Sequence, residues 1–121
     1  MRRGYRHSKA EVFVKQRPGS SPEAYVYEAQ SLAWLREAHA DNDGCPVPWV
    51  RDVGVDRLTL DRIPTQTPNR QAARTFGTQL ANTHGAGAGA FGELPPKATR
   101  CFIADLPLPE GTWETFGSFY A

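Results

Sequence analysis

Residues 12–35 of this 121-residue chain read VFVKQRPGSSPEAYVYEAQSLAWL, and this stretch decides the fold. The apolar residues before Lys15 predict a short strand. A helix is expected to begin near residue 22, because Ser21 can cap it and proline suits its first turn. Apolar residues then recur at three- and four-residue spacing, with Glu28 in the middle of the stripe. The stripe consists of Ala24, Tyr25, Ala29, Leu32 and Leu35.

A carboxylate on the core-facing side of a helix needs a cationic partner or hydrogen bonds. The nearest cation at the end of a neighbouring strand is Lys15. In kinase-like folds a strand lysine directs its ammonium at the α- and β-phosphates of ATP, and a glutamate from the next helix holds that lysine. The residues alone leave a second interpretation open, in which Lys15 is a solvated strand-end lysine and Glu28 only flanks the stripe.

The segments that follow predict two more strands and a second helix. The first helix should end near His39, and residues 47–54 form an extended segment closed by a turn. Residues 57–63 alternate apolar and polar side chains, which is typical of a strand. A second helix is expected from about residue 68 to His84 and should be stopped by Gly85. Its predicted apolar face carries Ala73, Phe76, Leu80 and a packed, hydrogen-bonded His84.

In this order the motifs resemble the amino-terminal part of the fructosamine (ketosamine) kinases, over nearly the whole chain. The motifs are Phe13-Val14-Lys15, Tyr27-Glu28-Ala29, Val47-Pro48, Leu58 to Ile63, Gly77-x-x-Leu80-Ala81-x-x-His84, Phe91-Gly92, Leu106 to Pro109, Trp113 and Phe119-Tyr120. The resemblance implies an α+β class: a protein-kinase-like small lobe with an antiparallel sheet and one helix, a hinge, and the first helix and loop of the large lobe. Residues 1–63 would form the partial small lobe with its hinge strand. Residues 64–121 would begin the large lobe, with a helix over about 68–84, a glycine-rich loop over 85–92 and an irregular proline- and aromatic-rich segment over 93–121.

The resemblance also implies an activity, the transfer of the γ-phosphate of ATP to the sugar hydroxyl of ketoamines on protein lysines or small amines. Lys15 and Glu28 would then bind the nucleotide phosphates, and the backbone around Asp61, Arg62 and Ile63 would receive adenine. Asp61 stands where the family usually has a glutamate. The catalytic aspartate and the residues that bind Mg²⁺ are expected in the carboxyl-terminal lobe, so none is assigned in this chain.

The missing carboxyl-terminal lobe, which should supply the catalytic and Mg²⁺-binding acids, leads us to expect a truncated part that is inactive in isolation. Residues 1–11 keep at most the second strand and the turn of the glycine-bearing phosphate lid. His84-Gly85-Ala86 has Ala86 where a catalytic loop would carry its acid. The alternatives are a non-catalytic nucleotide-binding or interaction module derived from a kinase, or a related aminoglycoside- or choline-type kinase.

Composition limits the remaining expectations. The net charge is +1 with both signs mixed along the chain, so nothing predicts a nucleic-acid or membrane partner, and a cytoplasmic location is expected. Cys45 and Cys101 are expected to be free thiols, and no metal site is predicted. The aromatic residues of the last nine positions need a covering surface, which predicts self-association through the side that faces the large lobe.

Overall fold

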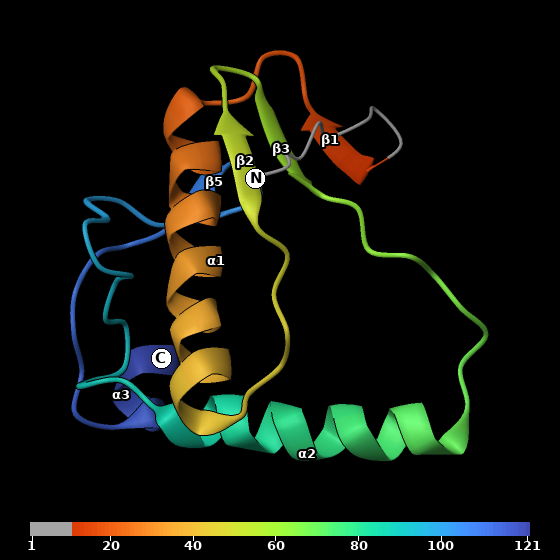
Figure 1. The fold of residues 1–121 in the computed structure, drawn as a ribbon. Helices are drawn as coiled ribbons and strands as arrows, with labels where there is room; N and C mark the ends of the chain where they lie inside the picture. Colours follow the sequence, from red (N-terminus) through yellow and green to blue (C-terminus); the bar gives the residue numbers. More distant parts are fainter. Residues whose placement is uncertain (1–10) are drawn as a thin grey trace, which may run out of the picture.

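The computed structural model describes residues 11–121, and its centre is a three-stranded antiparallel sheet (Figure 1). The strands are β1 (Val12–Gln16), β2 (Val50–Val53) and β3 (Arg57–Asp61), in the order β1-β3-β2. Lys15 lies opposite Leu58 in the β1–β3 register. Gly54 closes the turn between β2 and β3 by donating its N–H to the carbonyl of Arg57 at 2.8 Å. The predicted α+β class with an antiparallel sheet is confirmed.

Helix α1 (Pro22–Asn42) packs against this sheet and forms the small core with it. The buried residues are Tyr25, Leu58 and Leu60, joined by the half-buried Ala29, Leu32 and Val50. The predicted apolar stripe is therefore correct except at its end, since Leu35 is 44% exposed. A small core of this kind leaves the position of α1 dependent on few contacts.

The ends of α1 differ from the prediction in detail. Ser21 occupies the N-cap position, but its side chain makes no capping hydrogen bond. The helix continues to Asn42 instead of ending near His39, so the predicted end is wrong by one turn. It stops where Asp43 takes a left-handed conformation (φ 53°) and donates its N–H to the carbonyl of Ala38. Aspartate tolerates this conformation better than most residues, which makes it an effective C-cap.

Helix α2 (Arg70–Ala86) lies across the carboxyl-terminal end of α1 (Figure 1). Asn69 caps it by accepting the Ala72 N–H at 2.8 Å. The helix passes through Gly85, where the sequence predicts a stop, and ends at Ala86 because Gly87 has a positive φ of 65°. Hydrogen bonds join its last turns to the end of α1, among them Asn42 Nδ2 to the Asn82 carbonyl at 2.6 Å.

The predicted apolar face of α2 is largely uncovered in the part of the chain that the structure describes. Ala73 and His84 are exposed, Phe76 is 58% exposed, and only Leu80 is half-buried. The prediction of a packed His84 is therefore wrong. Periodicity identified the helix correctly, but it could not show whether another surface covers its apolar face.

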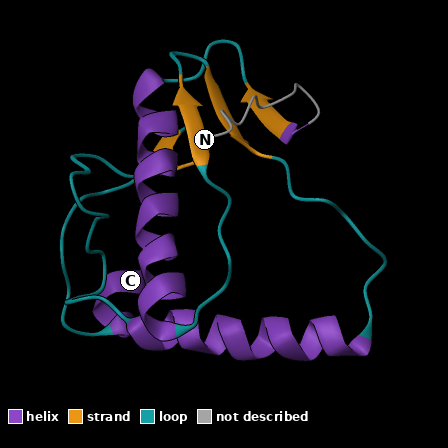
Figure 2. Cartoon of the chain, viewed as in Figure 1, coloured by secondary structure: helices purple, strands orange, loops and turns teal. Residues whose placement is uncertain are grey.

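The carboxyl-terminal part runs back along α1 before it reaches α3 (Phe116–Tyr120) (Figure 2). It contains a hairpin of β4 (Phe102–Ile103) and β5 (Leu106–Pro107), which the sequence predicts only as irregular. Phe91 and Trp113 pair their backbones in an isolated bridge. The aromatic rings of this carboxyl-terminal part pack on one another; they belong to Phe91, Trp113, Phe116, Phe119 and Tyr120.

Cys45 and Cys101 are free thiols, as predicted. None of the helices in the described range is long and apolar enough to cross a membrane. The turn and strand expected before Lys15 fall mostly on residues 1–10, outside the described residues. The predicted boundary near residue 63, between the partial small lobe and the start of the large lobe, stays a prediction.

Candidate functional site

The structure brings together the lysine and the glutamate that the sequence pairs. Lys15 comes from β1, an outer strand of the sheet held by its pairing with β3, and Glu28 comes from the second turn of α1, just after the buried Tyr25. Lys15 Nζ lies 2.5 Å from Glu28 Oε1. The side chains are 39% and 34% exposed, so the pair lies at the edge of the core, where water can reach it. An ion pair of this exposure contributes little to fold stability, because solvent screens it.

Lys15 and Glu28 line a cavity of about 380 Å³. One wall comes from β1, the loop after it and the first turns of α1, with Tyr25, Tyr27 and Ser31 around the pair. The other wall is the β4–β5 hairpin, residues 102–105. A cationic group that is anchored by a carboxylate and faces a cavity can bind an anionic ligand, and phosphate is the anion that a lysine most often binds in this arrangement.

Arg17 adds a second cation to this cavity. Its Nη1 lies 2.8 Å from Asp105 Oδ2, at the tip of the hairpin, and both side chains are about half exposed. The hydrogen bond and the charge of Asp105 raise the pKa of Arg17 above its ordinary value. The sequence contains no signal for this contact, because the two residues are 88 positions apart.

The predicted hinge residues lie elsewhere, and none of them lines the Lys15–Glu28 cavity. Asp61 ends β3 three residues after Leu58, the partner of Lys15, which places it about 10 Å further along the strand. Its carboxylate accepts two hydrogen bonds from Arg51, Nε to Oδ1 at 2.5 Å and Nη2 to Oδ2 at 2.8 Å. These bonds raise the pKa of Arg51 above its ordinary value. The side chain of Asp61 therefore ties β3 to β2.

The backbone N–H groups of the predicted hinge residues, Asp61, Arg62 and Ile63, differ in their hydrogen bonding. The Asp61 N–H donates to the Trp49 carbonyl at 2.9 Å, and the Arg62 N–H donates to the Glu11 carbonyl at 2.8 Å. Ile63 has left the sheet and is 62% exposed, and within residues 11–121 no hydrogen bond uses its N–H. Of the three backbone N–H groups, the one at Ile63 is thus the one open to a ligand.

A family model described as fructosamine kinase matches residues 2–121. The chain belongs to the fructosamine kinase family. No curated protein and no solved structure matches the chain. Membership assigns a kinase-like function in general terms. The resemblance found on the residues is confirmed over almost the whole chain.

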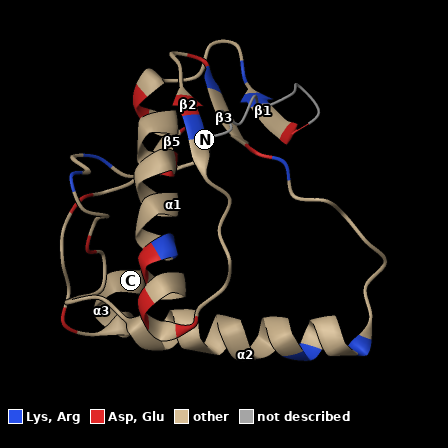
Figure 3. Ribbon diagram, viewed as in Figure 1, with Lys and Arg blue, Asp and Glu red and all other residues tan. Residues whose placement is uncertain are grey.

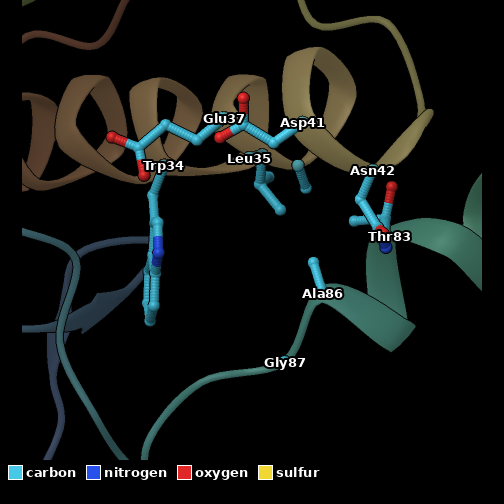
Figure 4. Close-up of a pocket in the computed structure, with 9 residues that line it drawn as sticks. Trp34, Leu35, Glu37, Asp41, Asn42, Thr83, Ala86 and Gly87 are labelled. Atoms are coloured by element: carbon cyan, nitrogen blue, oxygen red, sulfur yellow. The ribbon is translucent and has the colours of Figure 1, made fainter.

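A second cavity of this fructosamine kinase family member, of about 430 Å³, lies between α1 and α2 (Figure 4). Trp34, Glu37 and Asp41 line it from α1, and Thr83 and Gly87 line it from the end of α2. Figure 4 shows the two carboxylates above the opening and the indole along one side. This cavity is built at the end of α1 remote from Lys15, and neither Lys15 nor Glu28 lines it. It is therefore separate from the candidate site.

The described residues do not form a magnesium site. No group of three or more His, Cys, Asp or Glu side chains within residues 11–121 could hold a metal ion. Mg²⁺ prefers several oxygen ligands in octahedral geometry, and the two carboxylates at the cavity beside Lys15 are already paired, Glu28 with Lys15 and Asp105 with Arg17.

Proposed function

We propose that the complete protein transfers the γ-phosphoryl group of ATP to a sugar hydroxyl of a ketosamine, and that the part described here contributes to ATP binding. The observation that carries this proposal is the 2.5 Å contact between Lys15 and Glu28 beside a cavity, in a chain of the fructosamine kinase family. The bond from the γ-phosphorus to the bridging oxygen of ADP breaks and a bond to the sugar oxygen forms. ADP leaves, and the hydroxyl proton passes to a base.

Each residue has a limited role in this proposal. Lys15 binds the α- and β-phosphates as a point charge, and Glu28 holds its ammonium in position. Ile63, just beyond the sheet, offers a backbone N–H to adenine, whereas Asp61 and Arg62 shape the hinge through their contacts with Arg51 of β2 and with Glu11, just before β1. The base and the Mg²⁺ ligands would come from the carboxyl-terminal lobe that the resemblance implies.

Substrate class is tested by offering the complete protein three acceptors with ATP and Mg²⁺: fructosyl-lysine, an aminoglycoside and choline. Phosphate ester is expected on the sugar of fructosyl-lysine, with little on the others. Product from choline or the aminoglycoside alone would assign the protein to a related small-molecule kinase. Product from none, with nucleotide still bound, would favour the non-catalytic module.

Self-association follows from the uncovered apolar side chains. Phe76 on α2, Phe116 and Tyr120 on α3 are each more than half exposed, and such surfaces usually meet a partner. The 121-residue chain is expected to associate with itself, and Phe76→Gln should shift it toward monomer. Light scattering over a wide concentration range measures this. If the unmodified chain is a compact monomer at every concentration, the expectation is contradicted. Val55→Gln is a matched control, because Val55 is 70% exposed and lies in the turn between β2 and β3.

A cytoplasmic location is part of the proposal, supported by the free thiols Cys45 and Cys101. We also propose that neither nucleic acid nor a membrane surface is a partner. Acidic and basic residues are mixed along the ribbon of the sheet and of α1 (Figure 3), and the net charge of the chain is only +1, which supports this proposal.

A further inference from the structure

The β4–β5 hairpin contacts Arg17, the residue that follows the strand carrying Lys15. Its two-residue turn contains Ala104 with a φ of 52°, a left-handed conformation that costs energy for an alanine. This turn presents the Asp105 carboxylate to Arg17 at 2.8 Å. Arg17 lies two residues after Lys15, and both residues line the same cavity as Asp105. The ion pair therefore places the hairpin beside Lys15.

The same segment contacts α1 at three positions of one helical face. Arg100 pairs with Glu23 at 2.8 Å, the Phe102 ring lies 6.3 Å from the Tyr27 ring, and Gln30 Nε2 donates to the carbonyl of residue 97 at 3.2 Å. Positions 23, 27 and 30 follow one another at four- and three-residue spacing, so they share a face that does not pack on the sheet. Phe102 is only 7% exposed, so this contact is part of the packed interior.

Glu28 therefore depends on two supports. One is the small core that α1 forms with β3, and the other is the segment on its outer face. Lys15 and Glu28 are carried by different elements, so any shift of α1 relative to β1 changes the distance between them. Residues 97–107, hereafter the hairpin brace, contact α1 through Arg100 and contact Arg17, the residue that follows β1, through Asp105.

We propose that the hairpin brace keeps Glu28 in contact with Lys15, and that Arg17 and Asp105 are positioning residues for ATP. This inference rests on the proposed function of Lys15 as a phosphate ligand. Neither residue needs to touch ATP; their ion pair holds the brace to β1 while Tyr27 and Phe102 hold it to α1. Loss of the pair should therefore weaken ATP use without unfolding the protein, because half-exposed ion pairs add little to stability.

The test is a charge exchange in the complete protein, with Arg17→Asp, Asp105→Arg and the double variant. Each single variant is expected to raise KM for ATP by about tenfold, less than the roughly hundredfold cost of a 1 Å displacement. The KM for the ketosamine and the melting temperature should stay close to wild type. The double variant should recover to within about threefold of wild type, since it restores the attraction with the charges reversed.

Binding of a fluorescent ATP analogue, measured on the same proteins, distinguishes a failure of the brace proposal from a failure of the proposed function. Arg57→Asp is the control, because it removes a similarly exposed pair with Asp52 at 3.6 Å on the β2–β3 hairpin and should leave binding unchanged. If Asp105→Arg does not fold, Asp105→Asn is expected to weaken binding by several-fold. Single variants within twofold of wild type, or a double variant no better than the singles, would overturn the brace alone. A wild-type protein that does not bind the analogue would overturn the proposed function and the brace with it.

Discussion

The 121-residue chain is expected to form no phosphorylated product from ATP, Mg²⁺ and fructosyl-lysine. Phosphoryl transfer depends on stabilising the charge of the transferring group, mainly by metal ions and their acidic ligands. The described residues offer Lys15 but no cluster of acids that could hold Mg²⁺. Positioning of the phosphates by one lysine cannot replace that contribution, so the rate should equal that of a blank.

The assay follows radiolabelled phosphate from ATP into the sugar over several hours. The control is the same preparation with Lys15→Met, which removes the proposed phosphate ligand and leaves any contaminating kinase unchanged. Turnover above the blank that disappears in Lys15→Met would show that residues 1–121 suffice for catalysis. It would contradict our assignment of the catalytic acids to another part of the protein.

Lys15→Met in the complete protein is expected to lower kcat/KM for ATP by about a hundredfold or more. Loss of the ammonium that aligns the phosphates should lower the reaction rate at least as much as a 1 Å displacement of a reacting group. Glu28→Ala should cause a loss of similar size, because the ammonium then lacks its anchor. Melting temperatures should change little, since both side chains are more than a third exposed.

Matched controls separate these effects from general damage. Glu37→Ala removes an exposed glutamate from the same helix, remote from the pair, and should leave the kinetics unchanged. Arg74→Met removes an exposed cation from α2, outside the cavity of Lys15, and should also be neutral. Near-wild-type activity of Lys15→Met would mean that Lys15 is a solvated lysine with no part in the reaction.

Much of the local structure could be predicted because its signals lie close together in the sequence. The Tyr25 to Leu32 periodicity identified the face of α1 that packs on the sheet, and the alternation over 57–63 identified β3. The same periodicity placed Glu28 next to the core, where its nearest cation was Lys15. The errors at the helix ends arose because residues with a positive φ, Asp43 after α1 and Gly87 after α2, end the helices, and several neighbouring residues could have done so.

Contacts between distant segments could not be predicted in the same way. The hairpin at 102–107 has strands of two residues each, too short for a periodic signal, and the residues just before it, Lys97 and Arg100, have partners on α1 that are 67 and 77 positions away in sequence. The bidentate contact of Arg51 with Asp61 also depends on strand register, including the irregularity between Val50 and Asp52. The exposure of α2 depends on what covers it, and a hydrophobic pattern contains no such information.

The central claim is that Lys15 and Glu28 act as one unit on ATP, and a double-mutant cycle tests it most directly. The measurement is kcat/KM for ATP in the complete protein with wild-type residues, Lys15→Met, Glu28→Ala and both changes. We predict that the double variant is little worse than either single one, because residues that act through each other are non-additive. Losses that multiply fully in the double variant, or a Lys15→Met protein with wild-type activity, would contradict the claim.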